Sequence, residues 1–317
     1  MSRDSVALVF PGQGAQSSGM GTGLVEAGVA PRLLDVASAA GLDLRQLVSE
    51  GTAEQLRPTE VAQPALYYTG VALAQLLQDR AVEPLCAGGH SVGEFCALAV
   101  AGSLDPEAGM ELVIARGRLM ATAPEGSMAA VLGLEPELLE SICAEVSEAG
   151  ECCVVANYNC PGQSVISGTV AGVEVASDRA RAAGARRVVG LNVAGAFHSP
   201  LMAEAAERFA VLIDRAEIRA PRFPVVCGTE GRLVTTAAEV RDGLRLQLER
   251  PVRWTSSVTA MAAAGVELFM ECGPGNTLAG LIKRTVEGAE VVSVSSPTGV
   301  AELGSSLVAG RASPPVS

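Results

Sequence analysis

The chain of 317 residues is 49% hydrophobic but only 3% aromatic, and its formal net charge is −12. This length suits one large α/β domain with room for an insertion. The acidic balance argues against nucleic acid as a partner, because phosphate binding needs a concentrated basic surface. No stretch approaches the roughly 18 uninterrupted apolar residues of a membrane helix, and we therefore expect a cytoplasmic protein without a membrane segment.

Cysteine and histidine usage argues against a structural metal site. The sequence has eight cysteines and two histidines, and no Cys-x-x-Cys pair provides the ligand spacing of a zinc site. We expect reduced, mostly buried thiols, and neither a bound metal nor a cofactor. The cysteines are Cys86, Cys96, Cys143, Cys152, Cys153, Cys160, Cys227 and Cys272.

The first predicted element is a buried strand from Val6 to Phe10, followed by the loop Pro11-Gly12-Gln13-Gly14. The glycines of this loop permit backbone conformations that expose N–H groups at the end of the strand. The loop satisfies neither common nucleotide motif, because position 17 is Ser17 instead of a third glycine and no Gly-Lys-Ser/Thr follows. Gln13 gains interest because strand ends converge on one edge of an α/β sheet.

A second predicted strand, ending near Gly88, leads into Gly89-His90-Ser91-Val92-Gly93. This Gly-x-Ser-x-Gly pattern is typical of a sharp turn from a strand into a helix, here the helix over 94–101, that exposes a serine hydroxyl. Ser91 would lie at the helix N-terminus, where the N–H of Val92 would face an oxyanion. The alternative is a glycine-rich turn without chemistry, since five-residue patterns also arise by chance.

The next predicted helix begins at Asp105-Pro106, a capping side chain followed by proline, and runs to about Ala121. Steps of three and four residues place Arg116 on its apolar side. A buried guanidinium needs an anion, so its partner should be either a carboxylate of the protein or a carboxylate of a ligand. The predicted inner face consists of Leu112, Val113, Arg116, Leu119 and Met120.

Residues 127–194 change in character and read as a small inserted subdomain. Their predicted order is β-α-β-β-α-β, which is the order of a ferredoxin-like unit. The strands are expected over 128–134, 152–157, 163–168 and 187–193, and the helices over 137–149 and 170–183.

His198 precedes Ser199-Pro200, a cap-and-proline start of a helix that should run to Arg215. Because His90 adjoins Ser91 and would point elsewhere, His198 is the natural base for the serine hydroxyl. The positive end of the helix should keep the imidazole neutral near pH 7. The alternative is a hydrogen-bonded structural histidine.

The remaining elements continue the α/β pattern toward the C-terminus. Gly273-Pro274-Gly275 should precede a last helix, and the end of the chain after Gly310 should be frayed. We expect a strand over 225–227, helices through 264 and a strand over 266–271.

Seven ordered motifs extend along the chain between residue 5 and about residue 295. They are Phe10-Pro11-Gly12-Gln13-Gly14, Gln63-Pro64-Ala65-Leu66, Gly89-His90-Ser91-Val92-Gly93-Glu94, Arg116-Gly117-Arg118, Ala196-Phe197-His198-Ser199, Gln247-Leu248 with Pro251-Val252, and Gly273-Pro274-Gly275. Together they resemble the malonyl-CoA:acyl carrier protein transacylases, a far more specific match than Gly-x-Ser-x-Gly alone.

The resemblance implies an α/β-hydrolase-like large subdomain, over 1–126 and 195–300, with a ferredoxin-like insertion over 127–194 and a C-terminal tail over 301–317. It also implies ping-pong transfer of a malonyl group from malonyl-CoA, through a malonyl-serine, to the phosphopantetheine thiol of an acyl carrier protein. The pathway, fatty acid or polyketide synthesis, stays open.

Carried over by position, the resemblance implies a role for each site residue. Ser91 would be the nucleophile and His198 its base, and Arg116 would pair with the free malonyl carboxylate. Backbone N–H groups of Gln13 and Val92 would form the oxyanion hole. The main chain of Gln247 would orient the histidine in place of the aspartate of a triad. Val92 stands where leucine is common, which leaves the backbone role unchanged.

The resemblance also bears on the acyl group and the carrier protein. Phe197, bulky and directly before the histidine, should crowd an α-methyl group and favour malonyl over methylmalonyl by only about 10- to 200-fold. Met120 is expected to contact the substrate from the helix of Arg116. Carrier proteins of this family are acidic, so docking should use local basic groups, unless these are ordinary solvated surface. The candidates are Arg181, Arg186, Arg187, Lys283 and Arg284.

Three alternative functions remain open from the sequence. The same serine and base would make an acyl-carrier-protein thioester hydrolase if water reached the acyl-enzyme, although related hydrolytic proteins often lack the arginine at position 116. An acyltransferase that uses another extender, such as methylmalonyl-CoA, is a second alternative. A non-catalytic carrier-protein binding module is the third, and intact Ser91 and His198 argue against it.

Overall fold

The computed structural model describes residues 5–193 and 195–309 and has two sheets, each covered by helices. The predicted frayed segment after Gly310 lies outside the described residues. Within them, no helix has the length and apolar character needed to cross a membrane. The cysteines are free thiols, and all except the half-buried Cys152 are buried.

The large sheet has six strands in the order β10-β9-β1-β2-β7-β8. All neighbouring strands are parallel except the edge pair β7 and β8, which is antiparallel. The strands are β1 (Val6–Phe10), β2 (Cys86–Gly89), β7 (Val225–Cys227), β8 (Arg232–Val234), β9 (Leu268–Cys272) and β10 (Glu290–Val294).

Helices cover both faces of this sheet, so the central strand β1 is buried along its whole length. Alternate residues of β1 face opposite cores: Val6, Leu8 and Phe10 pack into one, and Ala7 and Val9 into the other. The helices that contribute to the first core include α4 (Thr59–Gln78), α5 (Gly93–Val100), α6 (Pro106–Ala121), α9 (Ala203–Arg215) and α10 (Ala237–Leu246). The second core is formed with α11 (Trp254–Ala263) and α12 (Thr277–Thr285).

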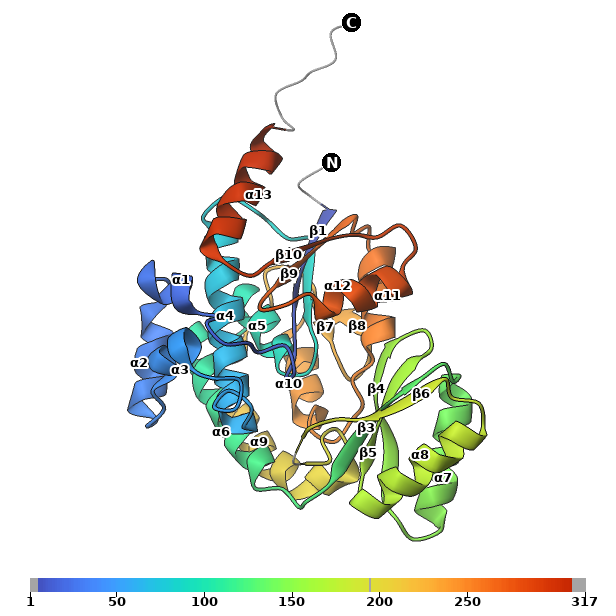
Figure 1. Ribbon diagram of the computed structural model, residues 1–317. Helices are drawn as coiled ribbons and strands as arrows, with labels where there is room; N and C mark the ends of the chain where they lie inside the picture. The colour runs from blue at the N-terminus through green and yellow to red at the C-terminus, as the bar shows by residue number, and fades with distance from the viewer. Residues whose placement is uncertain (1–4, 194, 310–317) are drawn as a thin grey trace, which may run out of the picture.

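The small subdomain has the predicted β-α-β-β-α-β order and packs two helices on one face of an antiparallel sheet (Figure 1). Its strand order, β4-β5-β3-β6, is that of a ferredoxin-like unit. The elements are β3 (Ser127–Leu132), α7 (Pro136–Glu148), β4 (Cys153–Cys160), β5 (Gln163–Gly168), α8 (Val170–Ala182) and β6 (Arg187–Gly190).

The structure corrects several predicted boundaries. Strand β6 ends at Gly190 instead of residue 193, because pairing with β3 stops at Ala129. The helix predicted from Pro200 begins as a single 3-10 turn, η2 (Pro200–Met202), before α9. Helix α12 is not the last element, since β10 pairs with β9 and α13 (Pro297–Ala309) follows. Part of the expected tail over 301–317 is therefore helical.

Three short helices and the long helix α4, in the segment between the first two strands, were not assigned from the sequence. Helices α1 (Thr22–Glu26), α2 (Pro31–Ala39) and α3 (Leu44–Glu50) pack around α4 and α6. The apolar run of α4 carries little amphipathic pattern, because most of this helix is buried.

The turn between β2 and α5 depends on glycines at 89 and 93. A side-chain Cβ at Gly89 would lie 1.9 Å from the carbonyl carbon of Gly93, and one at Gly93 would lie 2.2 Å from the Phe10 carbonyl oxygen. These contacts leave no room for a larger residue at either position. Glycine at both positions therefore permits the sharp turn in which Ser91 has its left-handed φ of 53°. Because β1 and β2 are parallel neighbours, the turn lies beside the Pro11-Gly12-Gln13-Gly14 loop.

Candidate active site

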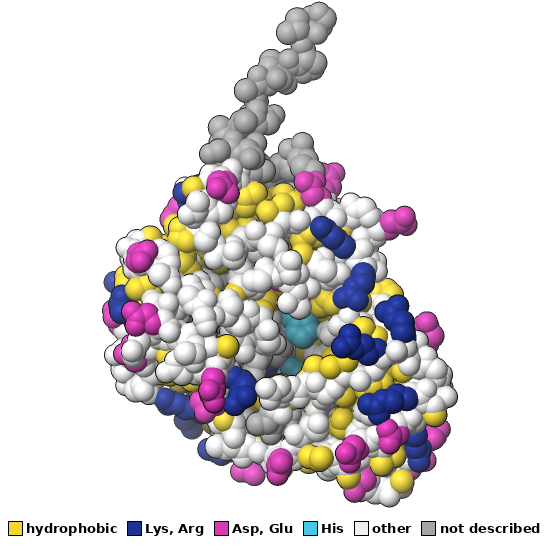
Figure 2. All heavy atoms as spheres, viewed as in Figure 1, with side chains coloured by type: hydrophobic (Ala, Val, Ile, Leu, Met, Phe, Trp, Pro, Cys, Tyr) yellow, Lys and Arg dark blue, Asp and Glu magenta, His cyan; other side chains and the backbone are white. Residues whose placement is uncertain are grey.

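A cavity of about 430 Å³ opens where the carboxyl ends of β1 and β2 meet the small subdomain. The glycine loop after β1, the turn at Ser91, α6 and α12 line one part of it, and β3, β4 and β5 line the other. Figure 2 shows a hollow on this face with histidine side chains inside it. Both histidines of the chain, His90 and His198, line the cavity.

The structure brings Ser91 and His198 into direct contact, although 107 residues separate them in the sequence. The distance between Ser91 Oγ and His198 Nε2 is 2.8 Å. Both residues have left-handed backbone conformations, with φ of 53° and 56°. Such conformations are costly for residues other than glycine, and they concentrate where function requires one orientation of a side chain.

Backbone carbonyl groups fix the orientation of the His198 ring. Its Nδ1 lies 2.8 Å from the carbonyl oxygen of Gln247 and 3.1 Å from that of Arg250. Carbonyl oxygens only accept hydrogen bonds, so Nδ1 carries the proton and donates. Nε2 is then the free acceptor that faces the hydroxyl of Ser91, which is the tautomer a general base requires.

The environment keeps His198 neutral. Burial, followed by the positive charge of Arg116 and the neighbouring His90, lowers the pKa of His198 to about 3. The ring therefore has the neutral state expected from the sequence. The expected cause was the end of a helix, whereas burial is the largest cause of the lowered pKa.

Arg116 is a buried guanidinium, 1% exposed, that points into the same cavity. Its Nε donates to Gln247 Oε1 at 3.1 Å, its Nη1 to Gln63 Oε1 at 2.6 Å, and its Nη2 to Ser91 Oγ at 3.1 Å. Burial lowers the pKa of Arg116 to about 10, so the group remains charged at neutral pH. Within residues 5–193 and 195–309, no carboxylate forms an ion pair with it, and the one internal acid that acts on its charge, Glu94, does so without contact.

Gln13 and Val92 lie beside Ser91 in the cavity wall. The side chain of Gln13 donates to Thr59 Oγ1 at 3.0 Å, which holds the glycine loop against α4. In the part of the chain that the structure describes, no acceptor takes the backbone N–H of Gln13 or Val92. Two residues with N–H groups that have no acceptor in the described chain therefore line the same cavity as Ser91.

Phe197 and Met120 also line the cavity. Both side chains are largely buried, at 7% and 3% exposure. Met120 Sδ accepts a hydrogen bond from Gln63 Nε2 at 3.2 Å, so the amide that binds Arg116 also fixes the methionine. Both side chains present apolar surface to whatever occupies the cavity.

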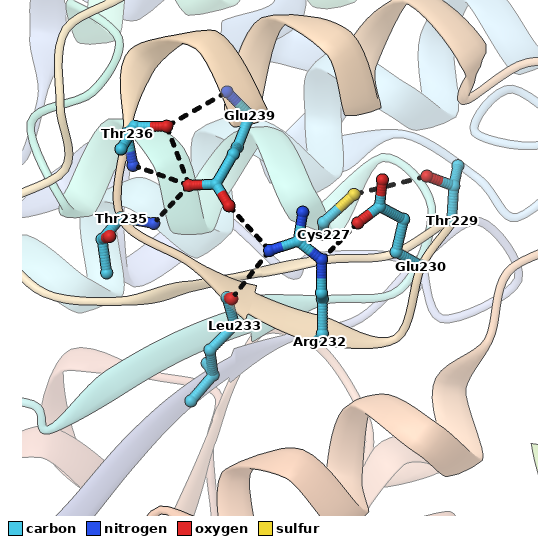
Figure 3. A network of polar contacts seen from close by, with 8 residues as sticks. All are labelled: Cys227, Thr229, Glu230, Arg232, Leu233, Thr235, Thr236 and Glu239. Atoms are coloured by element: carbon cyan, nitrogen blue, oxygen red, sulfur yellow. Dashed lines mark hydrogen bonds and ion pairs between the residues drawn. The ribbon is translucent and has the colours of Figure 1, made fainter.

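A network of charged and polar side chains on the surface lies at the start of α10, the helix whose C-cap is Gln247. Arg232 on β8 binds Glu230 and Glu239, and Glu239 forms a capping box with Thr236 at the start of α10 (Figure 3). These contacts lower the pKa of Glu239 to about 2. The helix that they join to the β7–β8 hairpin ends at Gln247, its C-cap.

Comparisons with known proteins show the family to which the chain belongs. The family described as acyl transferase domain matches residues 7–306. The malonyl CoA-acyl carrier protein transacylase of Bacillus subtilis is 40% identical over 297 residues, which cover 92% of this chain and 94% of that protein. The enzyme of the same name from Escherichia coli is 39% identical over 301 residues, covering 93% and 97% of the two chains. The chain belongs to this family.

Solved structures of family members have the same fold. The acyl carrier protein S-malonyltransferase of Vibrio cholerae has a TM-score of 0.89 and 38% identity, and covers 94% of this chain and 99% of its own. A malonyl-transacylase solved in complex with a type II polyketide synthase acyl-carrier protein has a TM-score of 0.88 and 36% identity, covering 95% and 99% of the chains. The α/β-hydrolase-like fold with a ferredoxin-like subdomain, expected from the sequence, is thereby confirmed.

Two site residues received no role in the sequence analysis. Gln63 and Glu94 were noted only as letters of motifs, yet Gln63 binds Arg116 and Glu94 binds Gln247. A signal was present for Gln63, since it is a polar residue within the apolar run of α4. Glu94 gave a weaker signal, because an acid in the first turn of a helix is common.

The depressed pKa of His198 leads to a prediction about the reactivity of Ser91. We expect the rate at which phenylmethylsulfonyl fluoride modifies Ser91 to vary by less than about twofold between pH 5 and 8, because the base is already deprotonated throughout this range. His198→Ala should lower that rate by about 100-fold or more. Intact-mass measurements over time give the rates, with Ser91→Ala as the unreactive control. A rate that falls tenfold per pH unit below 6.5 would contradict the assignment.

Proposed function

We propose that this protein transfers a malonyl group from malonyl-CoA to the phosphopantetheine thiol of an acyl carrier protein, through malonyl-Ser91. The observation that carries the proposal is Arg116: a buried guanidinium that donates to Ser91 Oγ and forms no ion pair with a carboxylate of the described chain. A group of this kind beside a nucleophile suits an acyl chain that ends in a carboxylate. Family membership supports the same substrate.

In the first half-reaction, His198 Nε2 takes the proton of Ser91 as Oγ attacks the thioester carbonyl. The new oxyanion accepts hydrogen bonds from the backbone N–H groups of Gln13 and Val92. The C–S bond then breaks, and His198 returns the proton to the sulfur of CoA. The Gln247 carbonyl oxygen, at 2.8 Å from Nδ1, stabilises the transient imidazolium as the aspartate of a triad would.

In the second half-reaction, the thiol of the carrier protein's phosphopantetheine enters the same cavity. His198 accepts its proton while the sulfur attacks the malonyl carbonyl, and the proton returns to Ser91 Oγ as the ester bond breaks. Arg116 holds the malonyl carboxylate through both steps, which keeps the carbonyl against the two N–H donors.

Phe197 and Met120 are proposed to set the choice of acyl group. Both side chains face the cavity beside Ser91 and Arg116, where the α-carbon of a malonyl group would lie. A methyl branch there would meet buried apolar surface that has little room to move. One methyl group accounts for only about 10- to 200-fold discrimination, so slow methylmalonyl transfer is compatible with this arrangement.

Basic side chains beside the cavity are proposed to receive the acidic carrier protein. Figure 2 shows several Lys and Arg side chains gathered near the hollow on the side of α12 and the small subdomain. Arg186, Arg187, Lys283 and Arg284 are exposed and form no ion pair among the described residues. Arg181 differs, because it forms an ion pair with Asp178 at 2.6 Å, and this acid partly offsets the positive charge that a carrier protein would meet.

The first prediction of this function concerns Ser91. Mixing the protein with malonyl-CoA should add the mass of one malonyl group, and adding a holo acyl carrier protein should move that mass to the carrier. Ser91→Ala should abolish loading, because no other hydroxyl touches His198 Nε2 in the described chain. Intact mass spectrometry of both proteins is the measurement. Release of free malonate in place of malonyl carrier protein would indicate a hydrolase, and absence of any adduct would indicate a binding module.

A second prediction separates malonyl from acetyl transfer. Arg116→Ala should slow malonyl loading by about 10- to 150-fold, because a hydrogen bond to a charged group contributes roughly 1.5 to 3 kcal/mol. Acetyl loading should change by less than about threefold. Arg118→Ala, on the exposed face of the same helix, is the matched control. Equal losses for both acyl groups would count against a carboxylate clamp.

A third prediction concerns carrier docking. Arg187→Glu combined with Lys283→Glu should raise the KM for the acyl carrier protein by about tenfold, since reversal of rim charges mainly weakens electrostatic encounter. Loading from malonyl-CoA should be affected less than threefold. Arg208→Glu, an exposed charge on α9, serves as control. If KM is unchanged at low salt, the docking surface lies elsewhere.

A further inference from the structure

Glu94 is a buried acid one helical turn from the nucleophile, and the proposed mechanism gives it no task. It lies in the first turn of α5 and is 4% exposed. Gln247 Nε2 donates to Glu94 Oε2 at 2.6 Å, and the backbone N–H of Gly228 also donates to the carboxylate. Burying a carboxylate is costly, so a group kept in this position requires a physical reason.

The amide of Gln247 connects Glu94 to Arg116. A guanidinium only donates hydrogen bonds, so the amide oxygen must face Arg116 Nε, and the amide nitrogen then faces Glu94. The negative charge of Glu94 acts on Arg116 across this amide, and each group favours the charged form of the other. The carboxylate thus lies one amide away from the guanidinium that it compensates.

The number of charges in the cavity changes when a malonyl group arrives. In the unacylated site, the positive Arg116 and a negative Glu94 sum to zero. A malonyl carboxylate adds a second negative charge to the same buried region, and two carboxylates that share one cation repel each other. Protonation of Glu94 would restore neutrality without moving any side chain.

We infer that Glu94 is the counter-charge of Arg116 in the unacylated site and takes up one proton from solvent when a malonyl carboxylate replaces it. This inference rests on the proposed malonyl transfer. It makes Glu94 a positioning residue whose charge state favours acyl groups that end in a carboxylate. The guanidinium stays compensated at every stage, and the acyl-enzyme carries no excess buried charge.

The ionisation of the surrounding groups supports this role. Burial raises the pKa of Glu94 to about 7, so both of its forms are accessible near neutral pH. The other charged or titratable groups that face it do not change state there. Arg116 on α6 stays positive, and the pKa of the Cys227 thiol at the end of β7 is raised to about 11. His198, which donates to the carbonyl of Gln247, also stays neutral.

The direction in which malonyl loading changes with pH follows from the linkage between loading and proton binding. A malonyl carboxylate near Arg116 raises the pKa of Glu94 further, so the malonyl-enzyme binds more protons than the free enzyme. Loading therefore becomes less favourable as pH rises through 7. The transfer chemistry itself exchanges no proton with solvent, because the proton of Ser91 leaves on the thiol of CoA. Acetyl loading has the same chemistry without a carboxylate and is the internal reference.

The test measures proton uptake on loading of the wild-type enzyme. Weakly buffered protein with an indicator dye at pH 7.5 is mixed with malonyl-CoA or acetyl-CoA, and intact mass spectrometry gives the acylated fraction. We expect malonyl loading to take up about half a proton or more per acylated site beyond acetyl loading. The ratio of the malonyl to the acetyl loading equilibrium constant should fall about tenfold from pH 6.5 to 8.5.

Two variants assign the proton to one residue. Glu94→Gln keeps the size of the side chain and removes its titration, so the extra uptake should vanish and the ratio should become independent of pH. Glu271→Gln is the matched control, because Glu271 is also a buried carboxyl whose pKa is raised by burial. It accepts from the backbone N–H groups of Leu278 and Ala279 and does not contact Arg116. Its variant should retain the uptake.

The outcomes separate the inference from the proposed function. A wild-type enzyme that gains no malonyl group refutes the function itself. A wild-type enzyme that is malonylated with no more proton uptake than acetylation refutes only the role of Glu94, and so does uptake that survives in Glu94→Gln or disappears in Glu271→Gln. If Glu94→Gln does not fold, the pH dependence of the wild-type ratio decides alone, and a ratio constant within twofold overturns the inference.

Discussion

The structure of the site depends on one constraint: a charged guanidinium is buried where no carboxylate touches it. Two amide oxygens, from Gln63 on α4 and Gln247 at the end of α10, accept hydrogen bonds from Arg116 in place of an acid. An internal ion pair would have satisfied the charge and closed the site to an anionic acyl group. Amide acceptors hold the group in place while leaving its charge available.

Backbone conformation supplies the second requirement, a serine and a histidine held in one orientation. Left-handed φ values at Ser91 and His198 are costly, and rigid elements on both sides stabilise them. The parallel pair β1 and β2 and the glycines at 89 and 93 fix the serine. The carbonyl groups of Gln247, the C-cap of α10, and of Arg250 fix the histidine, and the charged network in Figure 3 caps the opposite end of that helix.

The sequence was sufficient to predict those parts of the fold and the site that a local pattern of residues determines. The turn at Ser91, the inward face that carries Arg116 and the β-α-β-β-α-β order all follow from spacing within one segment. Gln63 and Glu94 could not be assigned in this way, because their partners lie 53 and 153 residues away and only tertiary packing brings them together. The edge strand β10, whose residues show little alternation between buried and exposed positions, was not predicted from the sequence. The predicted fold ended before this strand and therefore did not include α13, which follows β10.

Desolvation acts in opposite directions on three buried groups in and behind the cavity wall, His198, Arg116 and Glu94, and this explains how one small region supports several tasks. It lowers the pKa of His198, which leaves a neutral base, and it raises the pKa of Glu94 into the neutral range. Arg116 alone has an intrinsic pKa high enough to remain charged after the same loss of solvent. Of these three groups only Arg116 is therefore permanently charged, and any carboxylate that enters must compete for it with an acid that can be neutralised by one proton.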